Sequence, residues 1–303
     1  MILLKKYLEF LRNHQGNSAG TVTLRKQYVE RFLRECRGYN RPSTLNRLTP
    51  RTIHCYVIKT IRNRGRATRK HVVNSLRSFL KFAYINGYTS RNLVESVPVI
   101  RTTKLAGLPS GCSWSTVEKL LSVPDQRTAV GRRDYAIFML LATYGVRSGQ
   151  IARLRLQDIK WRTGTITFHA LKGGKTLHFP LQQEVARALL AYIKTDRQHI
   201  AHVLPEVFLT IKGIPQPLRG QLWNIVSNYF IQAKLSSPKF GPHSIRHAFA
   251  TRQMEKGTPI KSISDLLGHK SINSTFIYTK VDLNHLCILS RDWPAVEVMS
   301  CGK

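Results

Sequence analysis

The chain has 303 residues, and its 48 Lys and Arg outnumber its 16 Asp and Glu to give a formal charge of +32. Surface lysines alone seldom produce so large an excess, which indicates a polyanionic partner. No apolar run approaches the roughly 18 residues that a membrane-spanning helix needs. The opening residues 1–6 also lack the extended apolar region of a signal peptide. We therefore expect a cytoplasmic protein that does not bind membranes.

The cysteines indicate neither a disulfide framework nor a metal site. They are scattered and odd in number, no two form a C-x-x-C pair, and no histidine cluster stands beside them at metal-ligand spacing. We therefore predict reduced thiols and no structural zinc. The cysteines are Cys36, Cys55, Cys112, Cys287 and Cys301.

Four segments in the first hundred residues have apolar residues at helical spacing. The first two run over residues 3–11 and 22–33. A third begins at Thr49-Pro50, an N-cap residue followed by proline at the first helical position. The fourth spans about residues 67–86 and stops at Gly87. Four amphipathic helices with short connections predict a small helical bundle.

Positive charge is concentrated in this predicted bundle. Residues 1–104 carry 22 Lys or Arg and 4 Asp or Glu, a net charge of +18. A run of like charge is usually a solvated face, and that interpretation stays open. Acidic residues are not mixed with the basic ones here, however, which favours contacts with a phosphate backbone. The residues concerned follow the third helix and continue along the fourth: Arg62, Arg64, Arg66, Arg69, Lys70, Arg77 and Lys81.

A segment rich in proline and glycine, residues 97–113, follows the bundle. It cannot hold a long helix and is predicted to be an interdomain linker. Beyond it, Ser115-x-x-Glu118 has the pattern of a capping box and predicts the start of a helix. A strongly apolar run at residues 134–143 predicts a buried helix.

Two β-rich runs, residues 165–168 and 176–179, flank Leu171-Lys172-Gly173-Gly174-Lys175. Gly-Gly between such runs is a hairpin signal. The sequence therefore predicts a small antiparallel sheet in the second half of the chain.

Further helices are predicted on both sides of residue 200. Their apolar positions span residues 183–195 and 219–232, and we assign Trp223 to the core of the second. Thr258-Pro259 has the same cap-then-proline pattern as Thr49-Pro50 and predicts a short helix that ends near Gly268.

The stretch from residue 241 to 280 carries the candidate chemistry. It contains His243-x-x-Arg246 with His247 next to it, then Leu266-Leu267-Gly268-His269, then Tyr278. Residues three apart share one face of a helix. Arginine can pair with two phosphate oxygens at once, histidine can move a proton near neutral pH, and tyrosine can act as a covalent nucleophile. This set of side chains is suited to attack on a phosphodiester.

These motifs are ordered and spaced as in the C-terminal signature of the tyrosine recombinases, the phage-integrase family, which the chain resembles over most of residues 115–280. The string Tyr144-Gly145-Val146-Arg147 resembles the first arginine box of the family, so Arg147 maps onto its first catalytic arginine. The family has a catalytic lysine in the predicted hairpin, and the pattern aligns it with Lys172 in preference to Lys175.

One residue departs from the pattern of the family. A carboxylate usually stands three residues after the first arginine, whereas this chain has Gln150. We therefore expect a neutral hydrogen bond, in place of an ion pair, to hold Arg147.

The resemblance implies a mainly α fold with a small antiparallel β-sheet. Residues 1–96 would form an N-terminal helical core-binding (SAM-like) bundle that binds DNA, and 97–113 the linker. Residues 114–290 would form the C-terminal tyrosine-recombinase catalytic domain, followed by a tail at 291–303.

The resemblance also implies a site-specific DNA recombinase or integrase that works through a covalent 3′-phosphotyrosine, with no cofactor, metal ion or ATP. Guanidinium groups and one imidazole would stabilise the non-bridging oxygens, another imidazole would act as base, a lysine as general acid and a phenol as nucleophile. His247 would brace the site. The residues implied to stabilise the oxygens are Arg147, Arg246 and His269. The implied base is His243, the general acid is Lys172 and the nucleophile is Tyr278.

Double-stranded DNA is the implied partner, bound by a homo-oligomer that is a tetramer in the synaptic complex, with accessory or related recombinase proteins. The protein would then lie on the nucleoid when bound to DNA. The leucine-rich segment at residues 283–289 could pack within the molecule or dock on a neighbouring protomer, and both interpretations stay open.

Two alternative functions share part of this pattern. A type IB topoisomerase-like enzyme would use the same chemistry but rejoin the strand differently, and a non-catalytic DNA-binding regulator would keep the basic surface. The presence of all six catalytic positions favours a recombinase over the regulator. A metal nuclease or deaminase is disfavoured because carboxylates are scarce and no metal-ligand cluster is evident.

Overall fold

The computed structural model divides into two compact units, one up to Lys104 and the other from Leu105 onward. The division falls inside the predicted linker. The structure describes residues 2–36, 41–100, 111–171, 174–197, 204–235, 240–269 and 271–275. Lys172, Tyr278 and the tail therefore lie outside the described residues, together with the leucine-rich segment before the tail.

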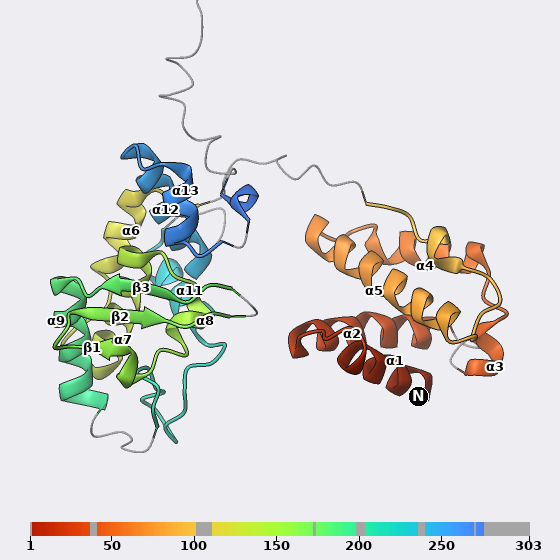
Figure 1. Cartoon of the computed structure of the whole chain (residues 1–303), viewed down its shortest axis with the longest axis horizontal. Coiled ribbons are helices and arrows are strands. Elements are labelled where there is room, and N and C mark those ends of the chain that lie inside the picture. The colour runs from red at the N-terminus through yellow and green to blue at the C-terminus, as the bar shows by residue number, and fades with distance from the viewer. Residues whose placement is uncertain are drawn as a thin grey trace, which may run out of the picture. The chain divides into compact units, whose positions relative to one another are not determined.

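The first unit is helical throughout its described part (Figure 1). The four predicted helices are present as α1, α2, α4 and α5. A short α3 and a 3₁₀ turn, η1, were not predicted. The central helix α5 contacts α1, α2, α4 and η1. The elements are α1 Ile2–Asn13, α2 Ala19–Glu35, α3 Pro42–Leu45, α4 Pro50–Ile61, α5 Arg66–Ile85 and η1 Leu93–Ser96.

Local signals set the ends of these helices. The Thr49 hydroxyl accepts a hydrogen bond from the backbone N–H of Thr52 at 3.3 Å, with Pro50 at the first position of α4. Gly87 follows α5 with a φ of 69°, which a residue without Cβ adopts readily. Aromatic rings then fill the core, with the ring of Phe79 5.4 Å from that of Tyr7 and 6.3 Å from that of Phe32.

The second unit combines helices with a small sheet (Figure 1). Its three strands lie in the order β1-β2-β3 and are antiparallel, with Thr167 opposite His178 in the predicted hairpin. The strand β1 was not predicted. The elements are α6 Trp114–Leu121, α7 Ala129–Tyr144, α8 Ser148–Ile151, η2 Leu156–Asp158, β1 Ile159–Lys160, β2 Thr165–Phe168, β3 Leu177–Pro180, α9 Gln183–Tyr192, the π-helical turn η3 Ile193–Arg197, α11 Leu222–Gln232, α12 Pro242–Glu255, α13 Ile260–Leu266 and η4 Ile272–Ser274.

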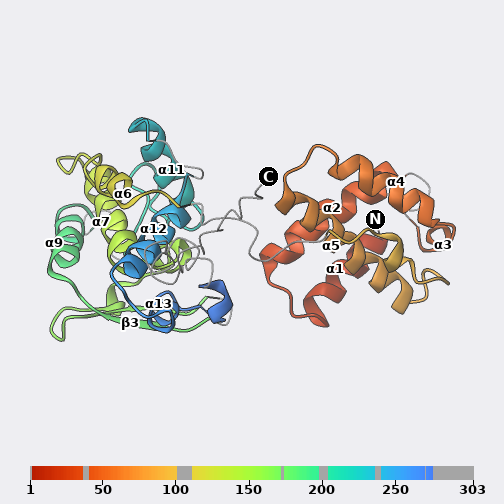
Figure 2. The ribbon, with the colours of Figure 1, turned by 90° about the horizontal axis from the view of Figure 1, so that it is seen from above.

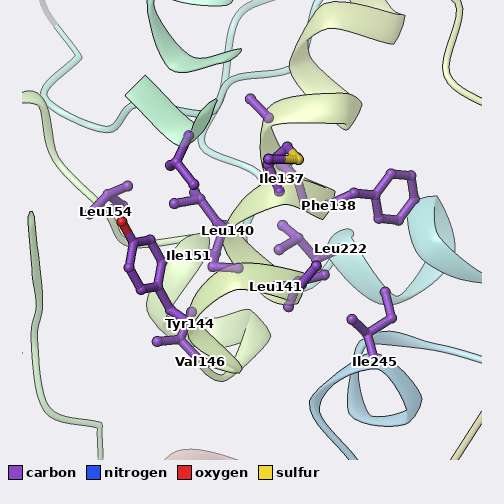
Figure 3. Close-up of a cluster of buried hydrophobic side chains, with 14 of the residues drawn as sticks. Ile137, Phe138, Leu140, Leu141, Tyr144, Val146, Ile151, Leu154, Leu222 and Ile245 are labelled. Carbon is purple, nitrogen blue, oxygen red and sulfur yellow. The ribbon is translucent and has the colours of Figure 1, made fainter. Parts of the chain in front are cut away.

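Helix α7 is the core of this unit and carries the predicted buried run. It lies between α9 and α12 and contacts both (Figure 2). Side chains of α7 meet Leu222 of α11 and Ile245 of α12 in one apolar cluster (Figure 3). Since α12 carries the H-x-x-R motif, this apolar packing fixes the position of the candidate catalytic helix.

Three local predictions were wrong. Helix α6 begins after Ser113, whose hydroxyl accepts from the backbone N–H of Thr116 at 3.2 Å, and Ser115 lies inside the helix. The Thr258 hydroxyl bonds the side chain of Gln253 at 3.2 Å and does not cap α13. Trp223 is 57% exposed because it lies on the outer side of α11.

We predict that Ser113→Ala lowers the free energy of unfolding by about 1 kcal/mol, the usual loss for an N-cap hydroxyl. Ser115→Ala is the matched control and should cost clearly less, because the Ser115 hydroxyl contacts only that of Ser113. Urea unfolding followed by tryptophan fluorescence reports on this unit, since Trp114, Trp161, Trp223 and Trp293 all follow residue 104. Equal losses in the two variants would show that Ser113 is not the cap.

Candidate active site

Three chain segments meet at the candidate active site: the turn after α7, the start of α12 and the turn after α13. A cavity of about 360 Å³ lies there, and both Arg147 and His243 line it together with Gly268. Arg246 and His269 adjoin these residues through the contacts described below. The structure thus brings together four of the six predicted catalytic residues, and the other two lie outside the described residues.

Arg246 is the buried centre of the site, with only 5% of its surface exposed. Its Nη1 donates to the carbonyl oxygen of Gly145 and its Nη2 to that of Leu267, both at 2.7 Å. Two short hydrogen bonds in different directions fix the plane of the guanidinium group. The charge of Arg246 is therefore both oriented and shielded from water.

Gly145 ends α7 in the left-handed conformation, with a φ of 59°. A Cβ on this residue would lie 2.3 Å from Cδ1 of Phe249, which belongs to α12. Glycine is thus required both by the backbone conformation and by the close approach of the two helices. The same turn directs the Gly145 carbonyl to Arg246 and places Arg147 two residues further on.

Arg147 immediately precedes α8, and its guanidinium group is held by backbone carbonyls. Nη1 donates to the oxygens of Leu267 and Gly268 at 3.4 and 3.2 Å, and Nη2 donates to that of Gly268 at 3.3 Å. Leu267 therefore accepts from both Arg147 and Arg246. These carbonyls end α13, where the helix dipole favours positive charge.

Gln150 does hold Arg147 by a neutral hydrogen bond, but at the backbone and not at the side chain. Its Oε1 accepts from the N–H of Arg147 at 3.1 Å, while its Nε2 donates to the carbonyl of His169 at 3.3 Å. A carboxylate could not make the second bond, because it has no proton to donate. The amide is therefore the chemically suitable group at this buried position.

The turn that presents these carbonyls ends α13 as predicted. Gly268 has a φ of 60°, and its N–H bonds the carbonyl of Asp265 at 2.9 Å. The N–H of His269 bonds the carbonyl of Ser264 at 3.0 Å, which completes a Schellman motif. His269 is thereby fixed at the backbone directly beside the arginine-binding carbonyls.

The ring of His269 is held by Thr275, a fully buried residue whose Oγ1 lies 2.8 Å from Nδ1. Burial lowers the pKa of His269 to about 4, and repulsion from Arg246, Arg147 and His247 acts in the same direction. The imidazole is consequently neutral at pH 7. If the Thr275 hydroxyl donates to Nδ1, the ring proton lies on Nε2 and can be donated to a bound anion.

The two histidines of α12 occupy different environments. His243 is exposed at the start of the helix and lines the cavity. His247 is half-buried. It packs closely against Gly111, because a Cβ placed on that glycine would lie 2.8 Å from the Cβ of His247. Of these two histidines, His243 is therefore the one that lines the cavity.

Lys172 lies outside the described residues, but the residues around it are informative. Leu171 and Gly174, on either side of the undescribed pair, both line the cavity. The alternative lysine, Lys175, forms an ion pair between its Nζ and Oδ1 of Asp265 at 3.2 Å. The hairpin loop is thus tied to α13, the helix that precedes His269.

The basic residues of the first unit differ in their surroundings. Arg77 is half-buried and donates to the carbonyls of Val94 and Val97, so it stabilises the turn η1. Arg69 is exposed, yet its guanidinium group donates to the carbonyls of Arg64 and Arg62. No residue of the predicted basic set forms an ion pair with a carboxylate in the described part of the chain. Those exposed without a side-chain bond to the fold are Arg62, Arg64, Arg66, Lys70 and Lys81.

Taken over the described ranges, no three His, Cys, Asp or Glu side chains gather where they could hold a metal ion. None of the helices in those ranges combines the length and the apolar character that crossing a bilayer requires. No acidic side chain is among the described residues that line the site cavity. Arginines and histidines gathered around a cavity are side chains suited to binding a phosphate ester.

Comparison with known proteins identifies the family. Residues 114–285 match the model of the phage integrase family. A putative integrase/recombinase y4rA of Sinorhizobium fredii is 30% identical, over 96% of this chain and 78% of its own length. The tyrosine recombinase XerD of Listeria monocytogenes is also 30% identical, over 92% of this chain and 94% of its own. The chain belongs to the phage integrase family of tyrosine recombinases and is a site-specific recombinase, as predicted.

Solved structures share the fold. The XerH recombinase in a post-cleavage complex with its palindromic difH substrate has a TM-score of 0.70 and 20% identity, covering 89% of this chain and 78% of that one. A lambda integrase dimer bound to a COC′ core site has a TM-score of 0.67 and 18% identity, covering 98% of both chains. The predicted fold class, a helical bundle followed by a catalytic domain with a small antiparallel sheet, is confirmed.

The lowered pKa of His269 predicts that the free energy of unfolding falls as the pH drops from about 6.5 to about 4. The folded protein binds this proton only near pH 4, whereas an unfolded histidine binds it near pH 6.5. Acid therefore favours the unfolded state in that interval. Urea unfolding at several pH values should show a weaker fall for His269→Gln than for the wild type. His178→Gln, a change at an exposed histidine, is the control and should behave as the wild type does. The assignment would be contradicted if stability fell with acid as steeply in His269→Gln as in the wild type and the control.

Proposed function

We propose that this recombinase cleaves and rejoins double-stranded DNA through a covalent 3′-phosphotyrosine formed on Tyr278, without a metal ion and without ATP. The observation that carries the proposal is the pair of guanidinium groups of Arg147 and Arg246. Both donate to the carbonyl of Leu267, and Arg147 lines the cavity. Two permanently charged, oriented donors can do for a phosphodiester what a metal ion does elsewhere.

The phosphorus passes through a five-coordinate transition state, in which charge grows on the non-bridging oxygens. Arg147 and Arg246 would stabilise those oxygens, and their geometry is set before the substrate arrives. His269 would add a third donor from its neutral ring, since its pKa of about 4 leaves one N–H to donate at pH 7. Prior orientation of all three donors avoids reorganisation during the reaction.

The phenol of Tyr278 would form the new bond to phosphorus while the bond to the 5′ oxygen breaks. A phenol with a pKa of about 10 must lose its proton for this attack. His243, exposed on the cavity, is the proposed base that takes the proton. The products are a 3′-phosphotyrosine and a free 5′-hydroxyl, and attack by another 5′-hydroxyl reverses the step.

Lys172 is the proposed general acid that protonates the leaving 5′ oxygen. Its position between Leu171 and Gly174, which both line the cavity, supports this role. Lys175 is the weaker candidate, because its ammonium group already pairs with Asp265. His247 is proposed to brace α12 and not to touch the phosphate.

The bundle would hold the duplex through its exposed basic residues, Arg62, Arg64, Arg66, Lys70 and Lys81. Contacts of this kind bind the phosphate backbone without reading the sequence. The palindromic substrate of XerH and the lambda integrase dimer on its core site support two copies on one DNA site. A tetramer would then join two sites, with accessory or related recombinases as further partners, on the nucleoid in the cytoplasm.

Tyr278→Phe removes only the phenolic oxygen, so we predict that DNA binding persists while the covalent complex disappears. The measurement is the fraction of SDS-resistant protein–DNA adduct formed on fragmented genomic DNA in excess EDTA, with sequencing of the DNA trapped by the wild type. Adducts formed by the variant would show that another residue is the nucleophile. Loss of the wild-type adduct in EDTA with rescue by magnesium would contradict the metal-free scheme. Lack of any wild-type adduct would instead favour the DNA-binding regulator.

The role of Lys172 predicts a selective rescue. Lys172→Ala should cleave ordinary DNA slowly, by about 10²–10⁴-fold, yet recover on a substrate with sulfur in place of the bridging 5′ oxygen, because a thiolate leaves without protonation. Lys175→Ala is the matched control and should be close to wild type on both substrates. Two results together would make Lys175 the acid. Lys172→Ala would have to stay slow on both substrates, and Lys175→Ala would have to be slow on ordinary DNA but recover on the sulfur substrate.

A further inference from the structure

A second cavity lies beside the catalytic one in the same unit. It has a volume of about 260 Å³ and is lined by Arg153, Arg155, Gln157 and His169, with the buried Gln150 in its wall. Leu171 lines this cavity and the catalytic cavity alike, so the two adjoin. Neither the proposed catalytic set nor the basic residues of the bundle include any of these groups.

The cavity offers hydrogen-bond donors and positive charge. Arg153, Arg155 and Gln157 are exposed, and within the described ranges the two guanidinium groups form no hydrogen bond or ion pair. Most other arginines at the core of this unit bind carboxylates or carbonyls, as Arg132 does with Asp196 at 2.7 Å. These two guanidinium groups are therefore available to an anion.

The acidic groups nearest to the cavity are already engaged. Asp158 is buried, with Oδ1 2.8 Å from Nε2 of His169 and Oδ2 accepting from the backbone N–H of Arg155 at 2.9 Å. Glu206 binds Arg219 at 2.9 Å. Burial acts to raise the pKa of Glu206, but this hydrogen bond and the nearby arginine charges outweigh burial and lower it. Neither carboxylate lines the cavity, so neither competes there with an incoming anion.

A chain of hydrogen bonds joins this cavity to the catalytic arginine. Gln150 accepts from the backbone of Arg147 and donates to the carbonyl of His169, and the ring of His169 is held by Asp158. The wall that positions Arg147 is thus also the wall of the second cavity. A ligand on one side would be held at a fixed distance from a ligand on the other.

We infer that this second cavity binds a non-scissile phosphodiester of the same DNA, with Arg153 and Arg155 supplying the charge. The inference rests on the proposed function: the two cavities adjoin at Leu171, so a strand held at the catalytic cavity would present its next phosphates to the second. A planar guanidinium group matches two phosphate oxygens, and Gln157 and His169 supply further polar contacts. The site fixes the register of the strand, so that the scissile phosphate meets Arg147.

The salt dependence of binding tests the inference independently of cleavage. Each phosphate neutralised adds about 0.9 to the magnitude of the slope of log affinity against log salt. The double variant Arg153→Gln/Arg155→Gln should therefore have a slope shallower by about 0.9 on a short fluorescein-labelled duplex of random sequence. Arg162→Gln, a change at another exposed arginine of this unit, should leave the slope unchanged. The site would be overturned if the wild type and the double variant had equal slopes. It would also be overturned if Arg162→Gln made the slope as shallow as the double variant does.

A substrate modification locates the phosphate. In the duplex recovered by trapping, one non-scissile phosphate at a time is replaced by a neutral methylphosphonate. The wild type and Arg162→Gln should lose affinity at one position near the cleavage point where the double variant loses none. The site would be overturned if, at every position, the methylphosphonate lowered the affinity of the double variant as much as that of the wild type. This holds even if Tyr278 forms the adduct. Failure of the adduct assay would leave the salt experiment to decide, so the two proposals fail separately.

Discussion

The site depends on one buried cation, the guanidinium group of Arg246, which bridges the carbonyls of Gly145 and Leu267 at 2.7 Å. Those carbonyls belong to the ends of α7 and α13, while Arg246 belongs to α12. The bridge therefore ties three helices together at the point where the substrate phosphate is proposed to bind. A buried charge is tolerated only when it is well bonded, so the helix ends must meet at this point for the unit to fold.

Carbonyl groups, and not carboxylates, orient the two arginines that are proposed to be catalytic. Arg147 also binds Leu267 and Gly268 through its side chain, and the Gln150 amide holds its backbone. A carboxylate partner would cancel much of the positive charge, whereas a neutral carbonyl leaves it to attract an anion. The low pKa of His269 follows first from burial, and the excess of positive charge on the neighbouring arginines lowers it further.

Sequence patterns predicted the elements whose signals are local. Thr49-Pro50, the hairpin around Gly174 and the turn at Gly268 depend on residues within a few positions, and the H-x-x-R spacing depends only on helix geometry. Contacts between distant segments were not predictable in this way. The Arg246 bridge to Gly145 and the bond from Gln150 to the carbonyl of His169 exist only after the helices pack. The exposure of Trp223 likewise depends on which side of α11 the core occupies.

Replacement of Arg246 by lysine tests this account most directly. Lys keeps the charge, but its single ammonium group lacks the planar fork that reaches both carbonyls. The account predicts that Arg246→Lys forms the covalent DNA adduct far more slowly than the wild type and unfolds at a lower urea concentration. Adduct formation at the wild-type rate with unchanged stability would show that charge alone suffices, and would contradict the bridge as the organising contact of the site.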